Sequence, residues 1–309
     1  MYNMHDPGPL VTTFSIVGYD PDAPAWGIAV SSRFLAVGAR TCWGAPNAGV
    51  VVVQAHLNTQ NGRDGVDLLK QGVAASEVIQ RLMAKDPHRD LRQMAVVDSQ
   101  GGISTYTGAR CGPWAGGVTG AFCAAQGNML LGGEGCAAMV EHFSTARGSL
   151  ARRLVDALTI GDEVAGDSRG RQATALYIVR PPWAEAFDVF TEPTIDLRVD
   201  DHENPFAELS RLLDLWELLF LPATEEERLP PNPPTVLRLQ RVLTKLKYYS
   251  GKPHGALDDA TLQAIKSLAR MQNFRKRLFV QSGGASTPEL LPWIDRRLLE
   301  HLETKVGLA

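Results

Sequence analysis

The sequence predicts an α+β fold: a four-layer αββα sandwich joined to a small C-terminal three-helix domain. Over residues 12–222, segments typical of strands and helices follow in the order strands, two helices, strands, two helices, strands. That order suits two packed sheets with helices on their outer faces. Residues 223–234 are rich in proline and are predicted to be a semi-rigid linker to a helical domain at 235–309. Residues 1–11, rich in proline and glycine, are predicted to form a flexible leader.

The composition is that of an ordinary globular protein and argues against several functional classes. The chain has 309 residues, of which 44% are hydrophobic and 21% charged, enough for one sizeable domain and a small one. Its net charge of −3 argues against a nucleic-acid-binding surface, and no apolar run reaches the ~18 residues of a membrane span. The N-terminus carries no signal-peptide pattern, so we expect a cytoplasmic protein with no nucleic-acid or membrane partner.

The four cysteines stand apart without Cys-x-x-Cys spacing and are expected to be buried, reduced thiols. They are Cys42, Cys111, Cys123 and Cys136. The run Asp200-Asp201-His202 could suggest a metal site, but three adjacent polar residues before a helix rarely converge on one ion. We therefore expect no metal and no cofactor.

The first predicted unit is a hairpin. Residues 12–20 alternate in polarity, with Phe14 and Ile16 facing a buried side, and residues 26–33 return as the second strand. The Asp- and Pro-rich stretch 20–24 between them is a turn.

The rest of the sandwich is predicted from hydrophobic periodicity, β-branched runs and turn residues. Strands are predicted at 48–56, 91–97, 103–107, 121–126, 172–179, 186–190 and 194–199, and helices at 64–71, 75–85, 134–145, 149–160 and 205–219.

Seven short motifs, in order along the chain, give the sequence a family resemblance. They occupy residues 13–17, 34–38, 107–111, 114–116, 125–130, 166–172 and 196–202. Together they resemble an uncharacterised bacterial family with an N-terminal-nucleophile (Ntn) hydrolase-like fold, domain of unknown function one thousand and twenty-eight. The resemblance spans about residues 12–220. It implies an Ntn-hydrolase-like sandwich more surely than it implies a reaction.

Thr13 is the candidate nucleophile that this resemblance implies. In Ntn hydrolases the base that activates such a threonine is its own free α-amine. Members of the resembled family commonly begin Met-Thr, whereas eleven residues and Thr12 precede Thr13 here. Either the leader is cut between Thr12 and Thr13, or the α-amine mechanism cannot operate and Thr13 is a structural strand residue.

Similarity to proteasome β subunits implies further site residues. There an Asp-Ser-Arg run follows the second strand. Ser31 stands at the aspartate position, and Arg33 is the arginine that would orient groups beside Thr13, with a surface ion pair as its alternative role. The turn 167–170 is similar to another proteasomal turn, so Asp167 would support the nucleophile. A simple Asp–Arg turn is the alternative for Asp167.

Substrate contacts are predicted from residues at strand ends. Gly127 and Asn128 stand where the resembled hydrolases place a backbone oxyanion donor, with a β-turn as the alternative. Gln54 and Asn58 are candidate amide donors to a substrate carbonyl, and Arg171 is a further candidate contact. An Asx-turn is the alternative for Asn58.

The C-terminal segment carries a signature of its own. A helix predicted over 236–243 precedes a Tyr-Tyr-Ser-Gly loop at 248–251, and a Gly-x-x-Asp turn at 255–258 caps a second helix through Asp258 or Asp259. These motifs resemble a peptidoglycan-binding domain, a three-helix bundle. The resemblance implies a peptidoglycan fragment as a partner.

The sequence therefore predicts an Ntn-type amidohydrolase that acts on a small amide or peptide-like bond through Thr13. The alternative is a non-catalytic Ntn-like scaffold for ligand binding or assembly, with the helical domain recognising a partner or a glycan. A homo-oligomer is expected in either case. A cell-wall amidase would additionally need an export route.

Overall fold

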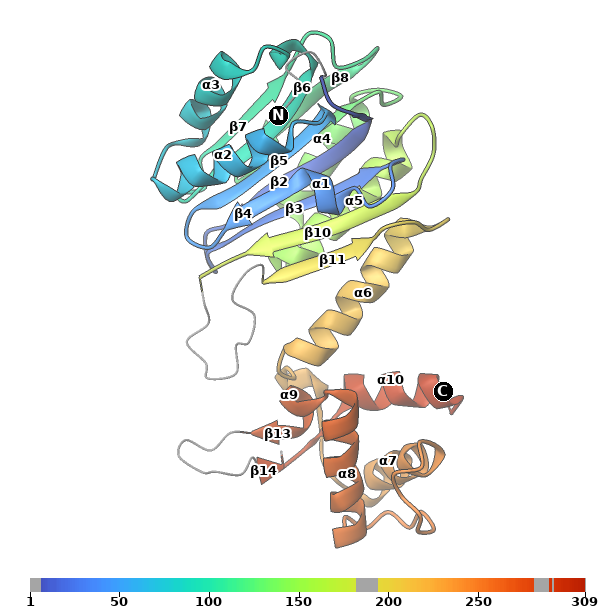
Figure 1. Ribbon diagram of the computed structural model, residues 1–309. Helices are drawn as coiled ribbons and strands as arrows, with labels where there is room; N and C mark the ends of the chain where they lie inside the picture. The colour runs from blue at the N-terminus through green and yellow to red at the C-terminus, as the bar shows by residue number, and fades with distance from the viewer. Residues whose placement is uncertain (1–6, 182–193, 281–288, 291, 309) are drawn as a thin grey trace. The chain divides into compact units, whose positions relative to one another are not determined.

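The chain forms two compact units, residues 1–213 and 214–309, and the division falls within helix α6 (Pro205–Phe220). The predicted strand 186–190 lies outside the described residues. The computed structural model, drawn in Figure 1, describes residues 7–181, 194–280, 289–290 and 292–308.

The first sheet of the N-terminal unit is antiparallel. Its described strands are β1 (Leu10–Val11), β4 (Cys42–Ala45), β5 (Gly49–His56), β6 (Arg92–Asp98) and β7 (Ile103–Thr107). The order is β1-β5-β6-β7, and β4 also pairs with β5. β5 is extended because its run of valines at 50–53 favours a pleated backbone. β6 turns into β7 at Asp98, whose carboxylate accepts hydrogen bonds from the N–H groups of Gln100 and Gly102.

The second sheet is also antiparallel. Its described strands are β2 (Thr13–Asp20), β3 (Ala25–Ser32), β8 (Ala115–Gly120), β9 (Cys123–Asn128), β10 (Ala173–Val179) and β11 (Ile195–Val199). Their order across the sheet is β11-β10-β3-β2-β9-β8. β2 and β3 are the predicted first hairpin, in register from Thr13 opposite Ser32 to Asp20 opposite Ala25. Because side chains alternate along a strand, odd-numbered residues of β2 face one side of the sheet and even-numbered residues the other.

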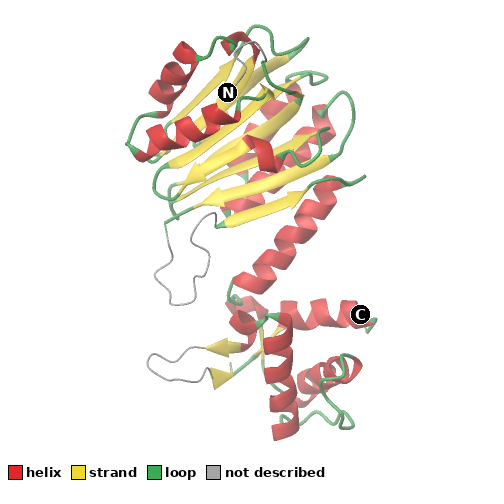
Figure 2. Ribbon diagram, in the orientation of Figure 1, coloured by secondary structure: helices red, strands yellow, loops and turns green. Residues whose placement is uncertain are grey.

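The two sheets pack face to face, as Figure 2 shows in yellow. Aliphatic and aromatic side chains from both sheets form one buried cluster, which excludes water and so stabilises the pair of sheets. This apolar cluster consists of Val17, Trp26, Ile28, Ala124 and Val179 of the second sheet with Val50, Val52, Ala95 and Val97 of the first.

Helix pairs cover the outer faces of the sheets. α2 (Thr59–Lys70) and α3 (Ala75–Lys85) pack on the first sheet, and α4 (Glu134–Thr145) and α5 (Leu150–Ala165) pack on the second. Gly18 of β2, for example, lies against Phe143 of α4 and Leu154 of α5. A short helix α1 (Gly38–Thr41) and a 3-10 turn η1 (Arg89–Leu91) connect the strands. The mixed α+β fold with antiparallel sheets is therefore confirmed.

Residues 7–11 differ from the predicted flexible leader. Val11 of β1 lies opposite Ala55 of β5, and the Leu57 N–H donates to the Pro9 carbonyl at 2.9 Å. Val11 is completely buried. The described part of the leader is a strand because an edge of the first sheet accepts its backbone, and composition alone does not reveal that edge.

The C-terminal unit is mainly helical, as predicted. Asp258 is the N-cap of its second long helix, with its carboxylate accepting the Thr261 N–H at 2.9 Å. Its described elements are η2 (Glu225–Glu227), β12 (Arg228–Leu229), α7 (Pro233–Lys245), α8 (Asp259–Gln272), α9 (Arg275–Leu278), β13 (Phe279–Val280), β14 (Glu289–Leu290), β15 (Ile294–Asp295) and α10 (Arg296–Val306). Apolar faces of α7, α8 and α10 meet in one core that includes Val236, Leu239, Leu243, Ile265, Leu268, Leu298 and Leu302.

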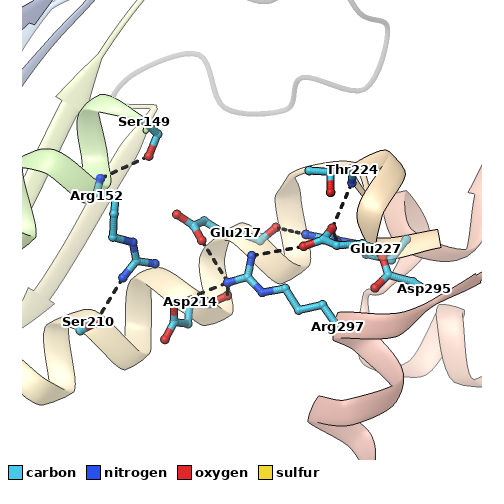
Figure 3. Close-up of polar contacts among 10 residues, drawn as sticks. Ser149, Arg152, Ser210, Asp214, Glu217, Thr224, Glu227, Asp295 and Arg297 are labelled. Atoms are coloured by element: carbon cyan, nitrogen blue, oxygen red, sulfur yellow. Dashed lines mark hydrogen bonds and ion pairs between the residues drawn. The ribbon is translucent and has the colours of Figure 1, made fainter. Parts of the chain in front are cut away.

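Residues 223–234, predicted to be a linker, make ordered contacts within the C-terminal unit. β12 pairs with β15, and the buried guanidinium of Arg277 donates to the carboxylates of Glu227 and Asp295. Figure 3 shows Arg297 beside Glu217 of α6, at 3.0 Å. The prolines restrict the backbone of this segment, and strand pairing and ion pairs attach it to the rest of the C-terminal unit.

Candidate active site

Thr13 lies where the chain crosses from the first sheet to the second. β1 ends at Val11 in the first sheet and β2 begins at Thr13 in the second, so Thr12 stands between the two sheets. The Thr13 side chain is completely buried, and its hydroxyl donates a hydrogen bond to the Val11 carbonyl at 2.9 Å. In the intact chain the hydroxyl of the candidate nucleophile is therefore hydrogen-bonded to the leader.

The peptide carbonyl that precedes Thr13 has two strong donors. The carbonyl oxygen of Thr12 accepts hydrogen bonds from the Ser32 hydroxyl and from the Arg169 guanidinium, the latter at 3.2 Å. The Thr12 hydroxyl lies 3.4 Å from a carboxylate oxygen of Asp167, to which it donates. A hydroxyl and a charged donor on one carbonyl oxygen polarise the bond and stabilise negative charge that develops there.

Asp167 holds one of these donors, Arg169, in place. Its carboxylate, only 3% exposed, accepts hydrogen bonds from the Arg33 backbone N–H at 3.2 Å and from the Arg169 guanidinium at 2.8 Å. The turn then continues through Gly170 at a φ of 98°, a left-handed conformation that favours glycine. The structure thus brings the predicted residue Asp167 next to Thr12 and Arg33 next to Asp167, while the Arg33 guanidinium itself donates to the Arg169 carbonyl.

A group of buried amides lies on the other side of Thr13, between the sheets. Gln54 of β5 and Asn128 of β9 each donate to the Thr13 carbonyl at 3.3 Å. Both also donate to the side-chain oxygen of Gln93 on β6, at 2.7 and 2.9 Å. The Ser15 hydroxyl donates to the Gln54 side-chain oxygen at 2.8 Å. We call Ser15, Gln54, Gln93 and Asn128 the amide cluster; all four are at most 1% exposed.

Gln93 ties the amide cluster to both sheets. Its side-chain nitrogen donates to the carbonyls of Gly127 and Gly116 at 2.8 and 3.2 Å, and to the Thr107 hydroxyl at 3.0 Å. Within the described part of the chain, the buried side-chain oxygen of Asn128 has no hydrogen-bond partner. The other side-chain oxygens and nitrogens of the three amides are satisfied, as buried polar groups must be to avoid a large cost.

Gly127 sits in the interior of the second sheet. It lies opposite Phe14 of β2 and Gly116 of β8. A Cβ atom at this position would come within 2.4 Å of the Leu130 side chain. Close packing therefore explains the glycine, and its role as an oxyanion donor stays a prediction from the resemblance.

Ser31 lies away from the candidate nucleophile. It pairs with Phe14 across β2 and β3, so its side chain shares the face that turns toward the helices. The next residue, Ser32, pairs with Thr13 and points to the other face, where its hydroxyl reaches Thr12. The prediction thus identified the right run of residues, but the contact is made by Ser32.

Asn58 caps a helix at a distance from the amide cluster. Its side-chain oxygen accepts the Gln60 N–H at 3.1 Å, so α2 begins at Thr59 rather than at residue 64. Its amide nitrogen donates to the Asp86 carboxylate at 3.2 Å. The alternative reading of Asn58 as a local structural residue agrees with these contacts.

Asp86 is a buried carboxylate beside this cap. Burial by itself would raise its pKa, but hydrogen bonds from Arg92, Asn61 and the His88 N–H outweigh burial and lower the pKa to about 2. Arg92 pairs with it at 2.8 Å. Arg92 directly precedes Gln93, so this ion pair fixes the end of β6 next to the amide cluster.

Arg171 also points away from Thr13. It forms an ion pair with Asp162 at 2.6 Å and lies over the ring of Phe206. Burial raises the pKa of Asp162 despite this pairing. An open polar cavity of about 490 Å³ lies on this side and is lined by Arg33, Arg171, Gln172, Asp201, His202 and Glu203.

The cysteines are poor candidates for a nucleophile. All four are free thiols. Burial raises the pKa of Cys42 and Cys136 to about 12, and it also raises the pKa of Cys111 and Cys123. A thiol needs to ionise in order to attack, so such shifts suppress its reactivity. Among the described residues, no group of three or more His, Cys, Asp or Glu side chains could hold a metal ion.

Four residues at the site escaped the sequence-based prediction: Ser15, Ser32, Gln93 and Arg169. Ser15, Ser32 and Arg169 stand within two residues of predicted ones, and their contacts depend on which face of a strand or turn they occupy. Gln93 carries no local signal, because its partners come from four other strands.

Comparison with known proteins identifies two regions of the chain. The model of a family described as "Family of unknown function (DUF1028)" matches residues 13–209, and that of a "Putative peptidoglycan binding domain" matches residues 219–287. A crystal structure of a Silicibacter pomeroyi protein, whose title names the DUF1028 family, is 29% identical with a TM-score of 0.60. The match covers 67% of this chain and 89% of that one. No curated protein matches the chain.

No helix in the described ranges is both long and apolar enough to cross a bilayer. The first family model covers well over half of the sequence and begins at the candidate nucleophile. The chain belongs to the DUF1028 family, and a region similar to a peptidoglycan-binding domain follows its family domain.

Proposed function

We propose that this protein is an Ntn-type amidohydrolase that cleaves a small amide or peptide-like bond with Thr13 as its nucleophile. Cleavage of the Thr12–Thr13 bond would first free the α-amine of Thr13. The observation that carries the proposal is the pair of donors, Ser32 and Arg169, on the Thr12 carbonyl oxygen. The layers of helices and sheets, which we assign to the Ntn type, and the start of the family match at Thr13 support it.

The release step breaks the C–N bond between Thr12 and Thr13. One water molecule attacks the Thr12 carbonyl carbon, and negative charge develops on the oxygen that Ser32 and Arg169 contact. The same water molecule provides the hydroxyl of the new Thr12 carboxyl group and a proton for the new amine. The freed amine is then the base that a threonine hydroxyl requires.

After release, each predicted residue near Thr13 has a role in the proposal. The Thr13 hydroxyl loses its contact with Val11 when the leader departs, and can turn to its own amine. Gln54 and Asn128 continue to hold the Thr13 carbonyl, and Asp167 keeps Arg33 beside the new N-terminus. Substrate would enter from the open polar cavity on the Arg33 side.

The alternative, a non-catalytic Ntn-like scaffold, also has an observation in its favour. In the intact chain Thr13 is completely buried, and its hydroxyl is satisfied by the Val11 carbonyl. A threonine that stays in this state cannot reach a substrate. The two proposals therefore differ in the mature N-terminus.

Intact-mass spectrometry of the purified full-length chain and of two matched arginine variants tests the proposal. A species beginning at Thr13 is expected for the unaltered sequence. Arg169→Met should slow its appearance about 10²–10³-fold, the usual effect of removing one oxyanion donor. Arg171→Met is the control, because that guanidinium contacts Asp162 instead of the Thr12 carbonyl.

Thr13→Ala should abolish hydrolysis of any amide substrate found. A chain that remains full-length and still hydrolyses the amide would overturn the α-amine mechanism. A chain that remains full-length and inert would favour the scaffold.

For the C-terminal unit we propose recognition of a peptidoglycan fragment, on the strength of the family match at 219–287. Co-sedimentation of the full chain with purified insoluble peptidoglycan tests this proposal, with chitin as the glycan control that lacks stem peptides. Equal sedimentation with both would show that the stem peptides are not recognised, and absent sedimentation with both would argue instead for a protein partner. Homo-oligomerisation stays a prediction, which light scattering would measure.

A further inference from the structure

We infer that Gln93 is a positioning residue for the Thr13 nucleophile, acting through the Thr13 carbonyl group. The inference rests on the proposed function and assigns a role to a residue that the resemblance does not identify. Gln93 is completely buried on β6, and among the described residues its side-chain hydrogen bonds go to other partners than Thr13. Its effect would be relayed by the two amides that do.

The geometry makes Gln93 the common partner of both donors to Thr13. The Gln54 and Asn128 amides reach the Thr13 carbonyl at 3.3 Å, and each is oriented by a shorter bond to the Gln93 oxygen, at 2.7 and 2.9 Å. A side-chain amide can rotate about its last bond, so a single acceptor that binds both nitrogens restricts both rotations. Gln93 itself is held by the Gly127 carbonyl at 2.8 Å.

This arrangement fixes the plane of the peptide bond that follows Thr13. The peptide bond is planar and its plane includes the Thr13 Cα atom, so holding the carbonyl oxygen restrains where that Cα atom lies. The hydroxyl is two bonds from this Cα atom, so the restraint limits where the hydroxyl can lie, while rotation about the Cα–C and Cα–Cβ bonds selects its direction. Reacting groups displaced by about 1 Å can lose about 10²-fold in rate, so such a restraint has a measurable consequence.

The amide cluster lies at a buried interface where packed apolar side chains would stabilise the fold equally well. Ser15 and Val17 face the same side of β2, and Val17 belongs to the apolar cluster. Replacing the amide cluster with packed aliphatic side chains would avoid the buried, unpartnered oxygen of Asn128. A role in orienting Thr13 explains why polar groups occupy this end of the interface.

Gln126 provides a matched control. It is a second completely buried glutamine at the same interface. With its amide oriented to satisfy both groups, it donates to the Met94 carbonyl at 2.7 Å and accepts the Ala95 N–H at 3.2 Å. Among the described residues, the hydrogen bonds of its side chain go to backbone groups of β6, and none goes to Gln54 or Asn128.

A selective NMR experiment tests the inference without relying on catalysis. Thr13-Phe14 is the one Thr-Phe pair in the sequence, so the full chain labelled with carbonyl ¹³C-threonine and ¹⁵N-phenylalanine gives a single correlation for the Thr13 carbonyl. Gln93→Met should move that ¹³C signal upfield and broaden it, because the donors become free to rotate. Gln126→Met should leave it in place.

Gln93→Glu and Thr107→Val complete the series. The carboxyl group at 93, kept neutral by the neighbouring Gly127 and Gly116 carbonyls, retains an acceptor for both amides and should restore the signal. Thr107→Val removes one acceptor of the Gln93 amide with little change in volume. If Gln93→Met does not fold, this variant should shift the signal in the same direction by a smaller amount.

An unmoved Thr13 signal in Gln93→Met, or in Thr107→Val where the former does not fold, would overturn the inference. So would equal changes in Gln93→Met and Gln126→Met. If the chain is also shown to cleave and hydrolyse, Gln93→Met should lower kcat about 10–10²-fold with little change in KM. If the unaltered chain never cleaves, the proposed function fails, while the NMR result still decides whether Gln93 orients Thr13.

Discussion

The interface between the two sheets has two halves of different chemistry. One half is the apolar cluster around Val17 and Trp26, where aliphatic and aromatic side chains from both sheets interlock. The other half is the amide cluster, in which Gln93 is the centre of a connected set of hydrogen bonds behind Thr13. β2 runs through both, and its residues Ser15 and Val17 lie on the same face only two positions apart.

The two halves contribute differently: the apolar cluster mainly stabilises the packed sheets, whereas the amide cluster mainly orients the groups that it binds. Apolar burial contributes about 25 cal/mol per Å² and has no preferred direction. A buried hydrogen bond contributes only about 1 kcal/mol net, but it fixes the angle between its partners, and breaking one partner leaves the other unsatisfied. The directional half of the interface lies at the end that carries Thr13. Substitutions in the two halves should therefore have different consequences.

The largest effect on stability is expected in the apolar half, from Trp26→Ala. Trp26 is 3% exposed, packs against Tyr19 with ring centroids 5.4 Å apart and the rings tilted by 32°, and donates from its indole to the Asp98 carbonyl. Removing the ring should lower the free energy of unfolding by about 3–5 kcal/mol. Urea unfolding followed by circular dichroism measures the loss.

Trp26→Phe is the control, since it keeps most of the ring volume and loses the indole hydrogen bond, for about 1 kcal/mol. If Trp26→Ala is no worse than Trp26→Phe, the apolar cluster is not the main source of stability at this interface.

A pair of substitutions on β2 compares the two halves directly. Val17→Ser removes buried methyl groups and adds a hydroxyl to an apolar site, which should cost about 2–4 kcal/mol. Ser15→Ala removes the donor to Gln54 and should cost about 1–2 kcal/mol. Ser15→Ala should nevertheless affect release of the leader more than Val17→Ser does.

The two free energies come from urea titrations, and leader release from intact mass. If Val17→Ser slows release of the leader more than Ser15→Ala does, the two halves do not differ in function in the proposed way.

A smaller effect is expected from Asp86, whose ionised carboxylate should make the free energy of unfolding depend on pH by about 2 kcal/mol. Its pKa is lowered from 3.8 in the unfolded chain to about 2 in the folded protein. The ionised carboxylate therefore stabilises the fold at pH values above about 4. This contribution is lost as the pH falls from about 4 towards 2.

Asp86→Asn should be less stable than the unaltered chain at neutral pH and nearly as stable near pH 2. Thermal unfolding at a series of pH values measures the difference. Parallel curves for the two proteins would mean that Asp86 is not the carboxylate responsible.

The smallest effect is expected on the surface of the N-terminal unit. Arg81 and Glu77 form an i,i+4 ion pair on α3 with both side chains about half exposed, at 46% and 49%. Arg81→Ala should cost about 0.3–0.5 kcal/mol, and less in high salt. A cost above about 1 kcal/mol at moderate ionic strength, from the same urea titration, would show that α3 is held by more than its apolar face.

Local patterns in the sequence predicted most of the elements. The alternation at 13–20, the valines at 50–53 and the i, i+3, i+4 spacing of α3 depend on near neighbours along the chain. These patterns operate within one strand or one helical turn, so they can be read without knowledge of the fold. The N-cap at Asp258 is predictable for the same reason.

Other features depended on partners far along the chain. The leader residue Val11 is a strand residue only because Ala55 lies beside it, and Ser32 rather than Ser31 reaches Thr12 because of the pairing register. A shift of one residue in register reverses the face of every side chain, and neither serine carries a signal that sets it.

For the candidate site, the sequence by itself was enough to predict Thr13 as the candidate nucleophile and to locate the turn at Asp167, since both belong to short ordered motifs. Only the tertiary structure decided which groups surround them. Gln93 meets Gln54 and Asn128 because β6 lies across from β9 and beside β5. Hydrogen bonds are effective only over about 3 Å, so a network built from three separate strands exists only after the two sheets have packed.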